Sequence, residues 1–322
     1  MGFSYFYRES GISSDILVVQ ADNREIEIAK FGRSAEIIMG LYPSFPMDAY
    51  NASYSNAYDF VALTFLVNIL KTRQLKWQYE RIKLLPDYYA GKHPCWGKIV
   101  LLEKLLNCPE YKKHKIVIFV DSDSWIRDQN KLKSLTDYLL SNTDINGIFS
   151  RDTYVPTNTY VNSGAFILKN NDYVRDLYSE MVSKLDSYSN WFNKLFYDQV
   201  LVSDTVFKNK SRFLICKPNI LNSPAGDIIR HNWLKQHKSL MESLKDEIIV
   251  SQFNEIFDNA IIEELDIEKI VDREPLYVGN WREIEPLTKK IRRVFFTEVH
   301  RIIEKIERNT RKYATMLDSK RK

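Results

Sequence analysis

The chain has 322 residues, enough for one large domain or for one domain with an extension. Its hydrophobic share of 44% and charged share of 27% are typical of a globular protein, and a net charge of +4 does not indicate nucleic-acid binding. The three cysteines, Cys95, Cys108 and Cys216, show no metal-binding spacing and form no even set. We therefore expect a reducing compartment rather than a disulfide framework.

The N-terminal segment lacks the charged start and long apolar core of a signal peptide. Phe6 occupies the position where a myristoylation signal beginning at Gly2 needs Ser or Thr. No apolar run approaches the ~18 residues of a membrane-spanning helix. We expect a cytoplasmic protein, with peripheral membrane attachment left open.

Strand-like and helix-like patterns alternate from residue 15 to residue 216. The predicted strands cover residues 15–20, 58–63, 117–120, 146–150, 160–168 and 212–216. The predicted helices cover residues 48–56, 96–106, 172–185 and 191–204. This alternation predicts an α/β fold with a mostly parallel sheet.

The composition changes beyond residue 245. Residues 255–271 are acidic and amphipathic, and residues 285–320 carry apolar side chains at helical spacing between basic flanks. We therefore predict an α/β domain over residues 1–245 and a helical extension over residues 246–322. The last helix fits binding to an anionic membrane, self-association or packing on the domain.

Two aspartates follow the strand over residues 117–120. Asp121 and Asp123 stand two positions apart, so on an extended chain both carboxylates project to the same side. The carboxyl end of a buried strand is also where ligands bind in open α/β sheets. The pair therefore predicts a site for a divalent cation.

Other chemically informative segments flank this pair. Trp96 and Lys98 lie on the preceding helix, and Asn162-Ser163-Gly164 falls inside a predicted strand, where a glycine often marks a close backbone approach. Asp198-Gln199 follows, and His231 comes after a strand-like stretch.

In this order, over roughly residues 14–240, the segments resemble the metal-dependent, retaining nucleotide-sugar glycosyltransferases of the GT-A fold, and within them the galactosyl-, mannosyl- and xylosyltransferase group. The resemblance implies a Rossmann-like sheet flanked by helices. It also implies transfer of a sugar from a nucleotide diphosphate sugar to a hydroxyl of a glycan, with retained configuration. We expect a UDP-linked donor.

The resemblance also assigns roles. Asp121, Asp123 and His231 would hold the metal, and imidazole beside carboxylates favours Mn²⁺ over Mg²⁺. Asp198 and Gln199 would act at the anomeric carbon. The donor contacts would be Gln20, Ala21, Asp22, Lys98, Asp121, Ser122, Asn162, Ser163, Gly164, Lys235 and Lys238.

One position departs from the family pattern. The family carries a glycine three residues after the histidine, whereas this chain has Leu234 there, followed by Lys235. It is therefore open whether Lys235 or Lys238 contacts the diphosphate or is a solvated helix residue. The first-strand residues Gln20, Ala21 and Asp22 are assigned from topology rather than from a motif.

Other interpretations remain open. A haloacid-dehalogenase-like phosphatase would use Asp121 as nucleophile and Asp123 as general acid, but it expects a small residue where this chain has Trp125. A non-catalytic scaffold would act through the basic C-terminal helix. Asp198 also fits a simple helix N-cap, and His231 a packing residue.

Overall fold

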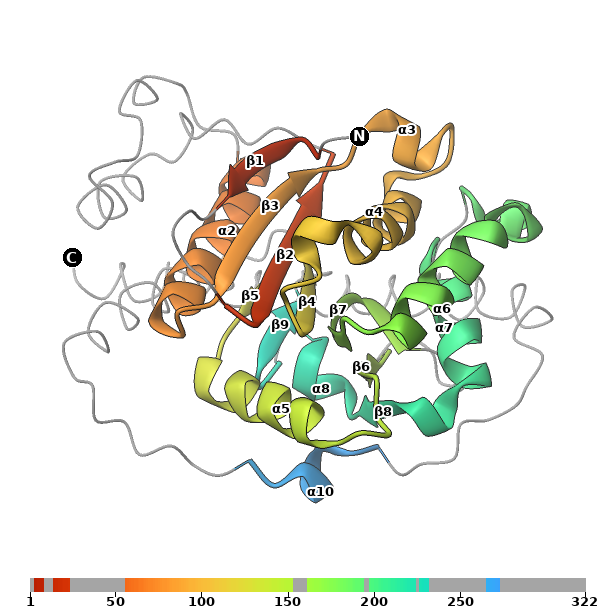
Figure 1. The fold of residues 1–322 in the computed structure, drawn as a ribbon. Helices are drawn as coiled ribbons and strands as arrows, with labels where there is room; N and C mark the ends of the chain where they lie inside the picture. Colours follow the sequence, from red (N-terminus) through yellow and green to blue (C-terminus); the bar gives the residue numbers. More distant parts are fainter. Residues whose placement is uncertain are drawn as a thin grey trace, which may run out of the picture. The chain divides into compact units, whose positions relative to one another are not determined.

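The computed structural model describes residues 3–8, 14–23, 56–152, 161–193, 197–223, 226–231 and 265–272. Within these ranges, helices flank a central sheet of seven strands in the order β1-β3-β2-β4-β7-β6-β8, and β5 and β9 form a second, two-stranded sheet (Figure 1). The strands are β1 Tyr5–Arg8, β2 Ile16–Asp22, β3 Gln78–Lys83, β4 Ile116–Asp121, β5 Ser124–Ile126, β6 Gly147–Arg151, β7 Val161–Lys169, β8 Phe213–Cys216 and β9 Ile229–His231. The helices are α2 Asn56–Gln74, α3 Pro86–Tyr89, α4 Gly97–Asn107, α5 Gln129–Ser141, α6 Asp172–Ser183, α7 Gln199–Lys208, α8 Pro218–Leu221 and α10 Ile267–Ile270, with 3-10 turns at η3 Pro94–Trp96, η4 Pro109–Tyr111, η5 Leu185–Trp191 and η6 Lys210–Arg212.

The central sheet is mixed but mostly parallel. Strands β2, β3, β4, β6 and β8 run in one direction, whereas β7 is antiparallel to both β4 and β6, and β1 is antiparallel to β3. The predicted α/β class is therefore confirmed. Because β7 is reversed, its first residues lie beside the carboxyl end of β4, where Val120 pairs with Ala165.

The strands predicted over residues 15–20, 117–120, 146–150, 160–168 and 212–216 are confirmed as β2, β4, β6, β7 and β8. Most of their residues are buried, as expected for strands covered on both faces. The short strands β1, β3 and β5 were not predicted, whereas β9 overlaps the strand-like stretch over residues 227–230 that precedes His231.

The helices predicted over residues 96–106 and 172–185 are confirmed as α4 and α6. The strand predicted over residues 58–63 is wrong, because this stretch lies within the helix α2. Its apolar run continues into Phe65, Val67, Ile69 and Leu70, which makes it too long for a strand.

The helix predicted over residues 191–204 is partly wrong. The 3-10 turn η5 ends at Trp191, and the regular helix α7 begins only at Gln199. The helix predicted over residues 48–56 lies outside the described residues except for its last position.

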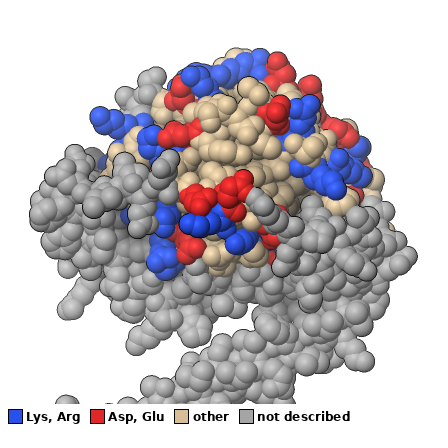
Figure 2. Space-filling model, turned by 90° about the horizontal axis from the view of Figure 1, so that it is seen from below, with Lys and Arg blue, Asp and Glu red and all other residues tan. Residues whose placement is uncertain are grey.

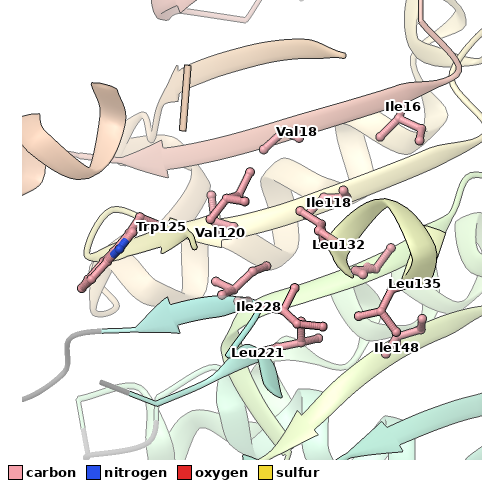
Figure 3. Packing of buried hydrophobic residues seen from close by; sticks show 14 of the residues in the cluster. Ile16, Val18, Ile118, Val120, Trp125, Leu132, Leu135, Ile148, Leu221 and Ile228 are labelled. Carbon is pink, nitrogen blue, oxygen red and sulfur yellow. The ribbon is translucent and has the colours of Figure 1, made fainter. Parts of the chain in front are cut away.

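One hydrophobic core fills the space between the sheet and the layer that contains α2 and α5. Alternate residues of the central strands, such as Val18 on β2 and Ile118 on β4, meet Leu132 and Leu135 of α5 (Figure 3). The opposite face carries the stacked rings of Phe119 and Phe166, over which Lys98 of α4 extends. Both faces of β4 are therefore covered, and only its carboxyl end opens into the site.

The helical extension lies largely outside the described residues, so the boundary at residue 245 and the helix predicted over residues 285–320 stay predictions. On the face that Figure 2 shows, acidic and basic side chains of the described residues are interspersed around an uncharged area. Among the described helices, none combines the length and the apolar character needed to span a membrane.

Candidate functional site

Two strand ends bring the predicted metal ligands together. Strand β4 ends at Asp121, and the chain continues through Asp123 into β5, which pairs with β9 so that Ser124 lies opposite His231. As a result, Nε2 of His231 is 3.1 Å from Oδ1 of Asp123 and 3.9 Å from Oδ2 of Asp121. The small β5–β9 sheet thus carries His231 to the end of β4.

The donor set suits a divalent cation. One ligand atom from each of Asp121, Asp123 and His231 can be chosen so that all three lie within 4.8 Å of one another. His231 is buried, whereas both aspartates are partly exposed, which leaves an access route from solvent. Two carboxylates and one imidazole are ligands that Mn²⁺ accepts readily, so the residues fit the predicted metal.

Asn222 orients the histidine, and no pattern in the sequence predicts this role. Its carboxamide Oδ1 lies 2.8 Å from Nδ1 of His231. Because a carbonyl oxygen can only accept, Nδ1 carries the proton of that hydrogen bond. In the neutral ring, the lone pair then resides on Nε2, which faces the two aspartates.

Gly164 is the residue against which this imidazole packs. A Cβ atom at position 164 would lie 2.2 Å from Cε1 and 2.5 Å from Nδ1 of His231. Its backbone N–H donates to Oδ1 of Asn162 at 2.6 Å. The group that approaches this glycine in the structure is the imidazole of His231, and the predicted approach to a ligand stays a prediction.

Lys98 connects the predicted metal ligand Asp121 to a further carboxylate, that of Asp198. Its Nζ lies 3.1 Å from Oδ1 of Asp121 and 3.3 Å from Oδ2 of Asp198, and it donates to the backbone oxygen of Ser163 at 3.2 Å. Lys98 is 5% exposed, so the solvated helix position is excluded for this lysine. The ammonium group is the shared counter-charge of two carboxylates.

The charges in this cluster shift one another's protonation. Burial alone would lower the pKa of Lys98, yet the carboxylates of Asp121 and Asp198 raise it above its ordinary value. Burial raises the pKa of Asp121 to about 6 against the opposing effects of Lys98 and His231, and it raises the pKa of Asp198 against Lys98. The pKa of His231 is raised despite burial, chiefly because of Asp123.

The backbone is strained where Asp198 enters the cluster. Tyr197 has a φ of +39°, a conformation that is rare outside glycine, and its ring stacks on His93 at 3.7 Å between centroids. Asp198 stands at the N-terminus of α7, but its side chain makes no capping hydrogen bond. Asp198 thus occupies the N-cap position that the alternative interpretation expected, while its carboxylate is directed to Lys98.

Gln199 lies in a hydrogen-bonded chain beside this carboxylate. Its Oε1 accepts from Nδ2 of Asn162 at 3.3 Å, and its Nε2 donates to the carboxylate of Asp152. All three side chains are buried. Asp152 was missed by sequence reasoning, because nothing around the end of β6 resembles a motif.

Gln20, Ala21 and Asp22 lie at the carboxyl end of β2, beside the carboxyl end of β4. Ala21 pairs with Asp121 in the β2–β4 ladder, and Asp22 pairs with Lys83. Gln20 is fully buried, donates to the backbone oxygen of Asp121 at 3.0 Å and accepts from the hydroxyl of Tyr79 at 2.7 Å. Gln20 therefore holds the end of β4 in place.

Helix α2 supports the loop that carries the two aspartates. The hydroxyl of Thr64 donates to the backbone oxygen of Ser122 at 2.6 Å. The side chain of Asn68 donates to the backbone oxygen of Ser124 at 3.0 Å and accepts from the N–H of Ile126 at 2.8 Å. Because this stretch was predicted to begin as a strand, these supporting residues were missed.

The predicted diphosphate contacts Lys235 and Lys238 lie outside the described residues. Of the other predicted site residues, Lys98 contacts the predicted metal ligand Asp121, and Ser163 and Asp198 both contact Lys98.

No protein-family model matches the chain, and a search of curated proteins finds no relative. Among solved structures, a glycosyltransferase involved in glycosylation of the major capsid of PBCV-1 is 13% identical and has a TM-score of 0.47; the match covers 72% of this chain and 98% of that one. The galactosyltransferase LgtC, in complex with donor and acceptor sugar analogs, is 15% identical over 73% of this chain and 95% of its own, with a TM-score of 0.41. Mouse xyloside xylosyltransferase 1 is 11% identical over 73% of this chain and 93% of its own, with a TM-score of 0.35.

Proposed function

We propose that the protein is a metal-dependent glycosyltransferase that moves a sugar from a nucleotide diphosphate sugar to a hydroxyl of a glycan. One observation carries the proposal. The carboxylate–imidazole group of Asp121, Asp123 and His231 lies directly beside a buried Lys98–Asp198 ion pair, at the carboxyl end of a central strand. A cation site for a diphosphate and a carboxylate site for a sugar are thus joined by one ammonium group.

The cation would be held by Asp121, Asp123 and His231, and we propose Mn²⁺ because one ligand is an imidazole. When bound, it neutralises the negative charge of the diphosphate, so that the sugar–phosphate bond breaks more easily. Lys98 adds a second, fixed positive charge between the metal ligands and Asp198. Preorganised charge of this kind stabilises negative charge as it develops on the leaving group.

On the sugar side, Asp198 and Gln199 would orient the donor sugar and stabilise positive charge at its anomeric carbon. Asn162, Ser163 and Gly164 would form the floor below it. We propose a retained anomeric configuration and a UDP-linked donor, and we assign no covalent nucleophile. Ala21, Asp22 and Ser122 are proposed to contact the nucleotide, and Lys235 or Lys238 the diphosphate.

The proposal is tested by measuring nucleotide release from a panel of UDP- and GDP-sugars, with and without Mn²⁺. We expect metal-dependent release of UDP that is abolished in Asp123→Ala. The matched control is Asp137→Ala, which removes an exposed carboxylate on α5 and leaves release unchanged.

A generic phosphomonoester is included in the same assay. Turnover of the phosphomonoester without turnover of any nucleotide sugar would overturn the proposal and favour the phosphatase, in which Asp121 would be the nucleophile. Metal-independent release of nucleotide would contradict the assigned role of the three ligands.

A further inference from the structure

The segment over residues 265–272 packs on the outer edge of the central sheet. Val271 forms an antiparallel bridge with Cys216 of β8, and the N–H of Asp272 donates to the oxygen of Ile215 at 2.8 Å. Ile270 is 7% exposed and belongs to the main hydrophobic core. The segment therefore pairs an edge that would otherwise present free backbone groups.

A buried ion pair links this segment to the neighbouring strand β6. Nε of Arg151 lies 2.7 Å from Oδ2 of Asp272, and their side chains are 3% and 8% exposed. A guanidinium group stays protonated in a protein, so its burial requires a compensating charge. Asp272 supplies that charge at the last residue of β6.

The ion pair acts where strand pairing is irregular. The register between β6 and β7 shifts between Phe149 and Arg151. Regular ladder hydrogen bonds therefore do not alone determine how the end of β6 is directed. A buried side-chain anchor at Arg151 supplies the missing constraint.

The residue that follows this anchor belongs to the site. Asp152 is 5% exposed, and its carboxylate accepts a hydrogen bond from Nε2 of Gln199. Gln199 in turn accepts from Asn162. The segment over residues 265–272 is thus connected to Asn162 through one ion pair, one peptide unit and two hydrogen bonds.

We infer that Asp272 is a positioning residue of the active site. Through Arg151 it fixes the end of β6, so that Asp152 holds the carboxamide of Gln199 in the orientation that the donor sugar needs. The inference rests on the proposed function, because Gln199 is assigned there to the donor sugar. On this inference, turnover requires residues 265–272, which lie outside the α/β domain predicted over residues 1–245.

The test uses the full chain and three variants. Asp272→Asn leaves the Arg151 guanidinium buried without its counter-charge, Asp272→Glu keeps the charge, and the double variant Arg151→Met with Asp272→Leu removes both charges together. The double variant keeps the test valid should Asp272→Asn fail to fold, since paired removal of buried charges is tolerated far better than single removal. Ile270→Val is the matched control, because it weakens packing of the same segment and leaves the ion pair intact.

We expect the kcat of nucleotide release to fall roughly 10-fold to 100-fold in Asp272→Asn and in the double variant, as for a misplaced substrate-orienting group. Affinity for Mn²⁺ and KM for the donor should stay near the wild-type values, and Asp272→Glu should restore most of kcat. Ile270→Val should lower Tm with kcat unchanged. A double variant that folds and turns over at the wild-type rate would overturn the inference, as would an equal loss of kcat in Ile270→Val.

A second readout does not depend on turnover. The side-chain amide resonance of Gln199, assigned from its loss in Gln199→Glu, should shift in the double variant and not in Ile270→Val. An unshifted resonance in the double variant rules out the positioning role. If the wild type releases nucleotide from none of the donors but the resonance shifts as expected, the proposed function fails while the structural coupling stands.

Discussion

Lys98 and Asp198 form a buried ion pair in which Nζ and Oδ2 lie 3.3 Å apart. The same ammonium group also lies 3.1 Å from Oδ1 of Asp121, so one lysine serves two carboxylates. These carboxylates have different proposed roles, since Asp121 is a predicted metal ligand and Asp198 is proposed to contact the donor sugar. Loss of the lysine should therefore affect both.

Lys98→Met should both destabilise the protein and abolish activity. The variant leaves the buried carboxylate of Asp198 and the partly exposed carboxylate of Asp121 without their shared counter-charge, and breaking a buried pair such as Lys98–Asp198 costs roughly 3–5 kcal/mol of unfolding free energy. Urea unfolding and nucleotide release measure the two effects. Lys133→Met, at an exposed ion pair on α5, is the control and should change the unfolding free energy by less than about 1 kcal/mol. Equal destabilisation by both variants would show that Lys98 is not the central counter-charge.

Gly164→Ala should weaken metal binding. The added methyl group would overlap the imidazole of His231, so the ring has to move away from Asp123. Disturbing the surroundings of a metal-bound histidine lowers affinity about 10-fold to 100-fold, and we expect a loss of this size for Mn²⁺ in a calorimetric titration. Gly97→Ala is the control, because the nearest side-chain atom to its new Cβ is 3.2 Å away on Tyr89. An unchanged Mn²⁺ affinity in Gly164→Ala would argue against His231 as a ligand.

The sequence alone was sufficient to predict most of the central strands and to single out Asp121 and Asp123. The strands are marked by continuous apolar runs, and the two aspartates stand two positions apart directly after one of these runs. His231 could be named only through the resemblance, since its contact with Asp123 depends on the pairing of β5 with β9. The stretch before His231 is strand-like, but nothing in these three-residue strands predicts that they pair with each other.

The supporting residues show why the rest could not be predicted. Asn68, Asp152 and Asn222 act through hydrogen bonds to residues that are not their neighbours in the chain, and isolated polar residues carry no spacing that could reveal such partners. The misread helix α2 illustrates a second cause. Its apolar and aromatic start fits a strand, and only the length of the whole run favours a helix.

Asn222 should contribute to metal affinity through the histidine it orients. Asn222→Ala removes the acceptor for Nδ1 of His231, so the ring loses its preferred tautomer and orientation, and Mn²⁺ affinity should fall about tenfold. Asn222→Asp keeps an acceptor oxygen at the same place and should retain most of the affinity. A wild-type Mn²⁺ affinity in Asn222→Ala would show that Asn222 does not contribute to metal binding.

His114 should make the stability of the fold depend on pH. Burial lowers the pKa of its imidazole below the ordinary value, and the neutral ring donates from Nδ1 to the backbone oxygen of Ser14 at 2.7 Å. In the unfolded chain the group takes up a proton as the pH falls through about 6.5, whereas the folded state resists protonation. The unfolded state then binds more protons, so this residue's contribution to stability is complete above that pH and is lost as the pH decreases.

His114→Asn removes the titrating group and isolates this contribution from that of the carboxylates whose pKa is raised, such as Asp121, which acts in the opposite direction. Urea unfolding of both proteins at pH 7.5 and pH 5.5 gives the comparison, with the wild type losing more stability between these pH values than the variant. Equal losses would mean that His114 is protonated in the folded state as readily as in the unfolded chain. That result would contradict the burial of its ring, which contacts Tyr111 and Ser14.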